Sequence, residues 1–275
     1  MLRIASVNVN GIRAAFRKGM AEWLATTPAE VITLQEVRAE TPDVTALIDA
    51  GWHIAHDPAL AKGRAGVAVV SALPLETVQV GLGPDSVDSS GRWLEVDITT
   101  ATGTTVRVVS AYVHSGEAGT PKQDAKYAFL EAMDHRMRQL GSKVSHAVVT
   151  GDLNVGHRTL DIKNWKGNLK SSGFLPEERA YFDRWLGAEG EPDYNTGSDG
   201  RFVDIGRHWA GEVEGPYSWW SFRGKAFDND AGWRIDYQLA TPALAATVKD
   251  YRVERAASYD TRWSDHAPVI ASYDV

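Results

Sequence analysis

The sequence predicts a layered α/β sandwich, in which helices cover β-sheets. Ten short runs have the alternation or the β-rich composition of strands, and many end in Gly, Pro or Asn. Three longer stretches carry apolar side chains at helical spacing. Short hairpin connections are mixed with long helical crossovers, which favours a layered sandwich over a strict βαβ repeat. No linker or repeat interrupts the pattern, so we expect residues 1–275 to form one domain.

Each predicted element follows from its own pattern. The predicted strands are residues 2–7, 31–35, 66–71, 93–98, 105–113, 145–150, 217–222, 234–240, 247–253 and 268–273. The predicted helices are residues 14–25, 122–140 and 177–186. The middle helix is the clearest, because Tyr127, Leu130, Met133, Met137 and Leu140 repeat at helical spacing.

The amino-acid composition excludes several kinds of functional site and bears on where the protein acts. The chain has no Cys, which excludes disulfides, thiolate zinc sites and a cysteine nucleophile. Its first residues lack the long apolar run of a signal peptide, and no stretch is long and apolar enough to span a bilayer. We therefore expect a cytoplasmic protein that does not contact membranes. The net charge of -7 argues against a globally basic surface but allows a local basic face.

Polar side chains cluster where predicted strands begin or end. The residues are Asn8, Glu36, Tyr112, Asp152, Asn154, Asp236, Asp265 and His266. Each of these residues could also have a structural role only. For example, the Gly151–Asn154 stretch alone fits a turn whose side chains cap their own backbone. Side chains at Asp152 and Asn154 also point the same way, because residues two apart in a strand share a face. Their repeated occurrence at strand ends favours a shared site.

Phosphodiester hydrolysis needs this set of residues. A hard cation such as Mg²⁺ prefers carboxylate and amide oxygens, which Glu36, Asn8 and Asp265 offer. Asp152 or His266 can take the proton of an attacking water. A buried Asp236 bonded to His266 would fix its tautomer and raise its pKa. Asn154 and Tyr112 can donate hydrogen bonds to the developing phosphate charge.

The ordered motifs resemble the exonuclease III family of abasic-site (AP) endonucleases, within the DNase I-like endonuclease/exonuclease/phosphatase fold. They are residues 6–14, 34–36, 66–71, 151–155, 164–168, 173–179, 232–237 and 264–269, and they run in the family order over essentially the whole chain. The resemblance implies a four-layer α/β sandwich of two packed mixed β-sheets flanked by helices, with the site at one edge.

The resemblance also implies a role for each matching residue. Glu36 resembles the principal metal ligand beside Asn8, and Asp265 a further metal-site carboxylate, with Mg²⁺ as the cofactor and Mn²⁺ as an alternative. Asp152 resembles the general acid/base, which touches metal only in some states, and Asn154 and His266 are further expected members of the metal site. Asn154 resembles the transition-state stabiliser, Asp236 and His266 the paired acid and histidine, and Tyr112 the active-site tyrosine.

The resemblance implies double-stranded DNA containing abasic or 3′-blocked sites as the partner, and we expect the protein to be a monomer. Basic side chains lie in predicted loops beside the motifs, where they would contact phosphates without reading sequence. The resemblance favours Arg13, Asn164 and Asn168 for this role. It also implies that Trp219, Trp233 and Ile235 form a pocket for the flipped-out baseless sugar, since a missing base makes flipping cheap.

The leading hypothesis is therefore an Mg²⁺-dependent AP endonuclease of base-excision repair that cuts 5′ to abasic sites. Removal of 3′-blocking groups, including 3′-phosphates, and 3′→5′ exonuclease activity would accompany it. Two alternatives are a phosphomonoesterase or lipid phosphatase of the same fold, and a non-catalytic DNA-binding relative. His114 and Arg64 depart from the family pattern and have no assigned role.

Overall fold

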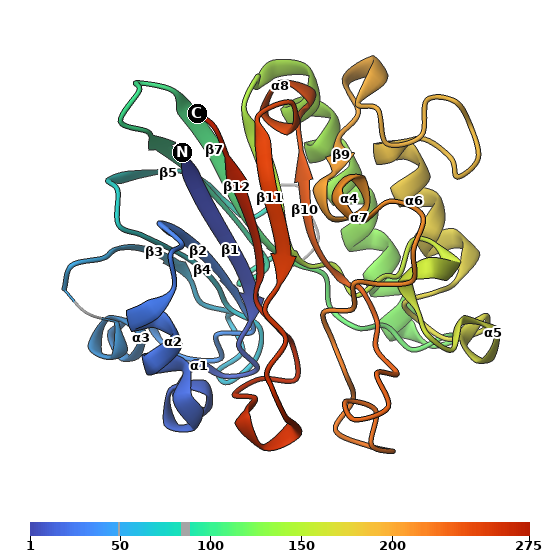
Figure 1. Cartoon of the computed structure of the whole chain (residues 1–275), viewed down its shortest axis with the longest axis horizontal. Coiled ribbons are helices and arrows are strands. Elements are labelled where there is room, and N and C mark those ends of the chain that lie inside the picture. The colour runs from blue at the N-terminus through green and yellow to red at the C-terminus, as the bar shows by residue number, and fades with distance from the viewer. Residues whose placement is uncertain (49, 84–88) are drawn as a thin grey trace.

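The computed structural model describes residues 1–48, 50–83 and 89–275 and contains two six-stranded sheets packed face to face (Figure 1). The first sheet has the strand order β11 (Val248–Val253), β12 (Val269–Tyr273), β1 (Leu2–Asn8), β2 (Val31–Gln35), β4 (Val67–Ser71) and β3 (His53–Asp57). The second has the order β5 (Leu75–Val80), β6 (Trp93–Thr99), β7 (Thr105–Tyr112), β8 (Ala147–Asp152), β10 (Asp236–Ala240) and β9 (Val203–Asp204).

Helices cover the outer face of each sheet (Figure 1). The first sheet packs against α1 (Ile12–Ala15), α2 (Ala21–Thr26) and α3 (Thr41–Leu47). The second packs against α4 (Pro121–Lys143) and α6 (Pro176–Leu186), while α5 (Trp165–Asn168), α7 (Ile205–Ala210) and α8 (Pro242–Ala245) are short. This confirms the predicted sandwich of two mixed sheets flanked by helices.

Strand pleating explains the layers, because successive side chains point to opposite faces. In β8, Val148 joins the core between the sheets and Val149 joins the core under α4 and α6. Hydroxyl groups also tie the two sheets together: Thr33 of β2 and Thr150 of β8 are hydrogen-bonded at 2.6 Å. Both side chains are buried, so the bond also satisfies polar groups that would otherwise be costly to bury.

The predicted strand at residues 217–222 is wrong. The backbone NH groups of Ser218 and Trp219 donate to Trp233 O, and that of Trp220 donates to Asp265 O. The segment thus exchanges partners from one residue to the next and forms only isolated bridges at Trp219. Of the aromatic side chains that gave the strand-like pattern, Trp219 lines the candidate site, whereas Tyr217 and Trp220 pack in a separate buried cluster with Phe227.

Other boundaries also differ from the predictions. Residues 14–25 form α1, a π-helical turn (Phe16–Met20) and α2 rather than one helix, because Gly19 has φ +117°. The predicted strand at 234–240 begins at Asp236. Strands β3 and β5 were not predicted, since β3 carries two histidines and β5 is an exposed edge strand.

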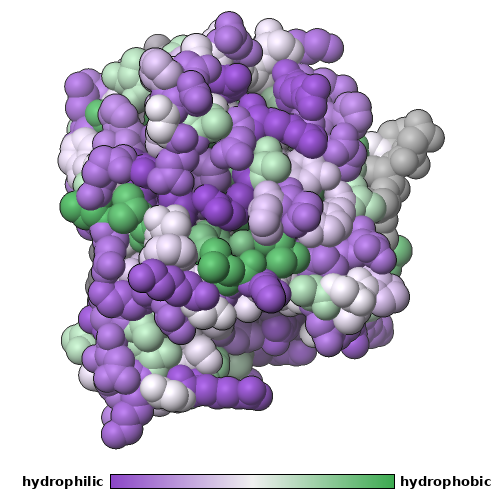
Figure 2. Space-filling view, turned by 90° about the vertical axis from the view of Figure 1, so that its right-hand side faces the viewer, coloured by the Kyte–Doolittle hydropathy of each residue, from purple (hydrophilic) through white to green (hydrophobic). Residues whose placement is uncertain are grey.

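The surface on the α4–α6 side of the molecule is mainly hydrophilic, with apolar groups in small patches (Figure 2). In the described part of the chain no helix combines the length and apolar character needed to cross a membrane.

Candidate active site

Strand ends meet at one edge of the sandwich. β1 and β2 run parallel and end together, and Glu36 directly follows β2. β7 and β8 also run parallel, with Tyr112 opposite Asp152. β10 runs antiparallel to β8 and begins at this edge, so Asp236 also lies opposite Asp152. The topology therefore gathers side chains that are far apart in the sequence.

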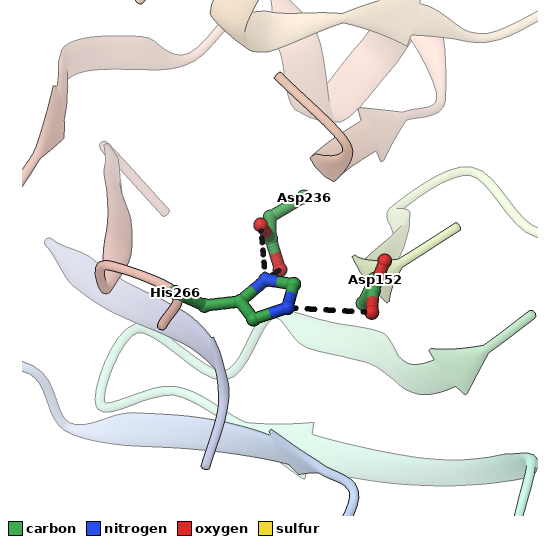
Figure 3. A group of neighbouring side chains, drawn as sticks. All are labelled: Asp152, Asp236 and His266. Atoms are coloured by element: carbon green, nitrogen blue, oxygen red, sulfur yellow. Dashed lines mark hydrogen bonds and ion pairs between the residues drawn. The ribbon is translucent and has the colours of Figure 1, made fainter. Parts of the chain in front are cut away.

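An acid–imidazole–acid arrangement lies at the centre of this edge (Figure 3). His266 Nδ1 lies 2.9 Å from Asp236 Oδ2, and its Nε2 faces Asp152 Oδ2 at 3.8 Å. Ser218 Oγ donates a 2.6 Å hydrogen bond to Asp236 and so helps to fix that carboxylate. All of these side chains are buried, so the charges interact across a region from which water is largely excluded.

Burial and neighbouring charges shift the pKa values of His266 and Asp152. Burial lowers the pKa of His266, but Asp236 and Asp152 outweigh it and raise that pKa to about 10. Burial raises the pKa of Asp152 to about 8, against the opposing effect of the imidazolium. The histidine therefore keeps its proton at neutral pH, whereas Asp152 can both accept and release one.

Asn154 is held against Asp152 by its backbone conformation. It has φ +49°, a left-handed conformation that costs energy in a residue other than glycine. This turn lets the Asn154 backbone NH donate to Asp152 Oδ1 at 2.9 Å, while its Nδ2 donates to Asp152 Oδ2 at 3.1 Å. Nδ2 also donates to Val113 O at 2.8 Å. The short turn recognised in the sequence thus caps its own backbone and also faces the site.

Asn8 links two carboxylates. Its Nδ2 donates to Glu36 Oε1 at 3.0 Å and to Asp152 Oδ2 at 2.9 Å. Tyr112 also hydrogen-bonds Glu36, and burial together with the charges of Glu36 and Asp152 raises the pKa of its phenol. Tyr112 therefore remains a protonated hydrogen-bond donor at neutral pH.

Asp265 completes the cluster from the loop before β12. It accepts hydrogen bonds from Asn10 Nδ2 at 2.8 Å and from Trp219 Nε1 at 3.0 Å. Burial opposes its ionisation, but the charge of His266 and these two bonds lower its pKa. Asn10 was not among the predicted site residues, although it lies in the same motif as Asn8.

The donor set fits a divalent cation. Asp152, Asp236 and Asp265 all act on the single buried imidazolium of His266, and Glu36 adds a fourth carboxylate next to Asn8, so carboxylates outnumber cationic groups in the cluster. Ligand atoms of Asp152, Asp236 and His266 lie within 4.8 Å of one another. Both ring nitrogens of that histidine already face carboxylates, however, so these three residues fit proton handling better than metal binding.

Glu36 is the better candidate metal ligand, because its carboxylate is partly exposed and the cation paired with it, Arg38, is itself exposed. Asn8, Asn154 and His266 direct nitrogens at carboxylates in this structure, so their predicted role as ligands stays a prediction.

A cavity of about 220 Å³ lies directly beside this cluster. Its lining residues are Ser115, Lys126, Asn154, Ser172, Gly173, Trp219, Trp233 and Ile235. The rings of Trp219 and Trp233 meet edge to face at 6.1 Å, and Trp219 also lies 6.4 Å from the His266 ring. The three residues predicted to form an apolar pocket are thus brought together.

A basic groove of about 450 Å³ lies on the other side of Tyr112. It is lined by Glu36, Arg38, Gly63, Arg64, Ala65, Arg92, Tyr112, His114, Ser115 and Lys122. Burial lowers the pKa of His114 to about 4, so it is neutral here. Sequence reasoning missed Arg92 and Lys122 because neither belongs to a recognised motif; only the folded arrangement brings them to the groove.

Three predicted DNA contacts lie outside this cluster. Arg13 is exposed on α1 and pairs with Asp43 at 3.1 Å. Asn164 precedes α5 and accepts a 2.8 Å hydrogen bond from Asn168 Nδ2 through its backbone oxygen. Helices α1 and α5 flank the site edge on opposite sides of the molecule (Figure 1).

A larger hollow of about 590 Å³, lined by residues of α4, α6 and the segment 199–202, contains none of the predicted site residues.

Comparisons with known proteins agree with this architecture. The model of the endonuclease/exonuclease/phosphatase family matches residues 5–266. An exodeoxyribonuclease of Bacillus subtilis is 34% identical over 98% of both chains, and a DNA repair nuclease of Danio rerio is 29% identical over 98% of this chain and 81% of its own.

Solved structures are similar over the full length of the chain. A 3′ phosphatase from Neisseria, bound to a product DNA hairpin, has a TM-score of 0.84 with 28% identity and full coverage of both chains. An AP endonuclease from Archaeoglobus fulgidus has a TM-score of 0.80 with 27% identity, again with full coverage of both.

Proposed function

Because the chain belongs to the exonuclease III branch of the endonuclease/exonuclease/phosphatase family of nucleases, we propose that it is a Mg²⁺-dependent AP endonuclease of base-excision repair. It hydrolyses the phosphodiester 5′ to an abasic site in double-stranded DNA and acts as a single-domain monomer. The observation that carries this proposal is the apolar cavity beside the acid–imidazole–acid cluster. A liquid water occupies roughly 30 Å³, so about 220 Å³ suits a baseless sugar better than a sugar carrying a base.

Asp152 is the proposed general base. It takes a proton from the attacking water as the new P–O bond forms and the bond from phosphorus to the 3′ oxygen breaks. Its raised pKa, about 8, gives the carboxylate more affinity for that proton than an exposed aspartate has. His266 is protonated at neutral pH, so it serves to hold Asp152 and to neutralise charge, and Asp236 orients it.

Hydrogen-bond donors surround the proposed position of the phosphate. The Tyr112 hydroxyl and Asn154 Nδ2 lie beside Asp152, and each can donate to a phosphoryl oxygen by exchanging its present bond to Glu36 or to Asp152 as negative charge develops on the phosphate. A Mg²⁺ ion held by Glu36, with Asp265 nearby, would polarise the phosphoryl group and stabilise the leaving oxyanion. The basic groove with Arg64, Arg92 and Lys122 would hold the adjoining strand by its phosphates.

The same site supports two further reactions. Removal of a 3′-phosphate or another 3′-blocking group breaks the same type of bond to a 3′ oxygen, and so does stepwise 3′→5′ exonuclease action.

Two alternative functions are less well supported. A phosphomonoesterase or lipid phosphatase needs a headgroup pocket in place of the tryptophan-lined cavity, and a non-catalytic relative would not need the intact buried cluster.

An incision assay tests the proposal. A duplex with a single abasic-site analogue is incubated with the protein in Mg²⁺ and then in EDTA. Incision that leaves a 3′-hydroxyl and a 5′-deoxyribose phosphate, and that stops in EDTA, is the expected result. Failure to incise this duplex in Mg²⁺, or incision that persists in EDTA, would sink the proposal.

A further inference from the structure

A buried ion pair that the proposed chemistry does not use lies at the wall of the cavity. Lys126 Nζ of α4 lies 2.6 Å from Glu178 Oε1 of α6, and both side chains have 0% exposure. Removing one partner of such a pair leaves a buried charge unpaired, so pairs of this kind are retained only where the surrounding hydrogen bonds satisfy both ions.

The lysine reaches one wall of the cavity. Its Nζ donates a 2.8 Å hydrogen bond to the backbone oxygen of Asn154, the residue with φ +49° whose side chain contacts Asp152. Lys126 therefore holds the backbone carbonyl of Asn154, a residue that lines the cavity. The Asn154 side chain keeps separate hydrogen bonds to Asp152 Oδ2 and to Val113 O, so displacement of the carbonyl changes the cavity wall and leaves the proposed phosphate donor in place.

The glutamate holds an adjacent part of the cavity wall. Glu178 Oε2 accepts hydrogen bonds from the backbone NH groups of Gly173 at 2.7 Å and of Leu175 at 3.0 Å. Its Oε1 also accepts from Ser172 Oγ at 3.2 Å and from Gln123 Nε2 at 3.0 Å. Ser172 and Gly173 line the cavity, so the carboxylate fixes the loop that forms this wall.

The two walls are close together. A Cβ atom added at Gly173 would lie 3.0 Å from the Asn154 backbone oxygen and 3.0 Å from the Trp233 ring. The Asn154 turn and the 172–173 loop therefore pack directly against each other beside Trp233, so a small displacement of either segment changes the shape of the cavity wall. The Lys126–Glu178 pair is hydrogen-bonded to both segments.

We propose that Lys126 and Glu178 are positioning residues that set the width of the cavity and so determine specificity for a substrate with a baseless sugar beyond the scissile phosphate. This inference rests on the proposed function. If these residues set the width of the cavity, their loss should affect incision at an abasic site more than removal of a 3′-phosphate, whereas a purely structural role would affect both activities equally. A 3′-phosphate carries no sugar beyond the phosphorus, so its removal leaves the cavity empty and does not depend on the width.

The test compares two substrates, an abasic duplex and a nicked duplex with a 3′-phosphate. The variant Lys126→Met/Glu178→Gln removes both charges and so leaves none buried alone. We expect its kcat/KM on the abasic duplex to fall by about tenfold or more, mainly through KM, because a displaced wall misplaces the sugar. Its kcat/KM for 3′-phosphate removal should change by less than about threefold.

Two further variants make the result interpretable. Arg136→Met breaks another ion pair of α4, with the buried Glu95, away from the cavity, and should leave the ratio of the two activities unchanged. Gln123→Ala removes only one donor to Glu178, and it supplies the comparison if the double variant does not fold. A smaller change of the ratio in the same direction is expected.

Equal loss of both activities in the cavity variants would overturn the positioning role and leave only a stabilising one. Failure of the wild-type protein to incise the abasic duplex would instead refute the proposed function, so the two failures are distinguishable.

Discussion

At the scale of single residues, the central feature is a histidine held charged between two buried carboxylates. The pKa of His266 is raised from 6.5 to about 10, chiefly by Asp236 and Asp152 acting against burial. A raised folded-state pKa means that the imidazolium stabilises the fold fully below about pH 6.5 and that this contribution is lost as the pH rises through about 10. The charge is thus retained over the physiological range.

Asp236→Asn should lower the pKa of His266, because it removes the strongest of the three negative neighbours and leaves burial unopposed at that nitrogen. The measurement is an NMR titration of the His266 ring in wild type and variant. Asp183→Asn is a matched control, since it removes the carboxylate partner of a different buried histidine, His157. An unchanged titration of His266 in Asp236→Asn would show that Asp236 does not set its charge.

The types of residue that meet in the candidate site were largely predictable from the sequence, but the contacts between them were not. Strand ends with carboxylates, amides and histidine predicted which residue types would meet at the sheet edge. The pattern could not say that both ring nitrogens of His266 face carboxylates, or that Asn10 and Lys126 hold site residues in place. Those contacts depend on residues far apart in sequence, such as the Asn10–Asp265 bond.

At the scale of elements, the cavity is built by segments that are not regular strands. The backbone of residues 217–220 bonds to the segments around Trp233 and Asp265 in turn. The prediction of a strand there failed because these aromatic, β-favouring residues pack outside any sheet, Trp219 beside the site and Tyr217 and Trp220 in a separate buried cluster. Long elements with a clear period, such as β8 and α4, were predictable because local pattern and packing agree in them.

Trp233→Ala should reduce incision of an abasic duplex by about tenfold or more, because it removes one apolar wall of the cavity. The variant should stay folded, since a partner segment still pairs with its backbone through Trp219. Incision kinetics and a thermal unfolding curve are measured together. Loss of the cooperative unfolding transition would show instead that Trp233 is a core residue.

At the scale of the whole molecule, the protein is acidic overall, but several of its basic side chains lie together in one groove, where a polyanion can be bound. The net charge is -7, yet Arg64, Arg92 and Lys122 gather in one groove beside the site. The sequence predicted basic loops near the motifs but not this groove, because Arg92 and Lys122 are distant in sequence and meet only through packing of the second sheet and α4.

Arg13→Ala should weaken binding to duplex DNA and flatten the salt dependence, with a log–log slope smaller in magnitude by about 0.9 if one phosphate contact is lost. Binding is measured by fluorescence anisotropy across a salt series. Arg138→Ala is the control, because this exposed arginine also pairs with an aspartate but lies on α4 away from the site. A slope equal to that of the wild type would remove Arg13 from the DNA-binding surface.

The most direct test of the account is the effect of Asp152→Asn on incision of an abasic duplex in Mg²⁺. The substitution keeps the size of the side chain but removes the proposed base, so kcat should fall by about a hundredfold or more. Binding of the duplex should persist, since the cavity and the basic groove are unchanged. Incision by Asp152→Asn at the wild-type rate would contradict the assignment of the active site.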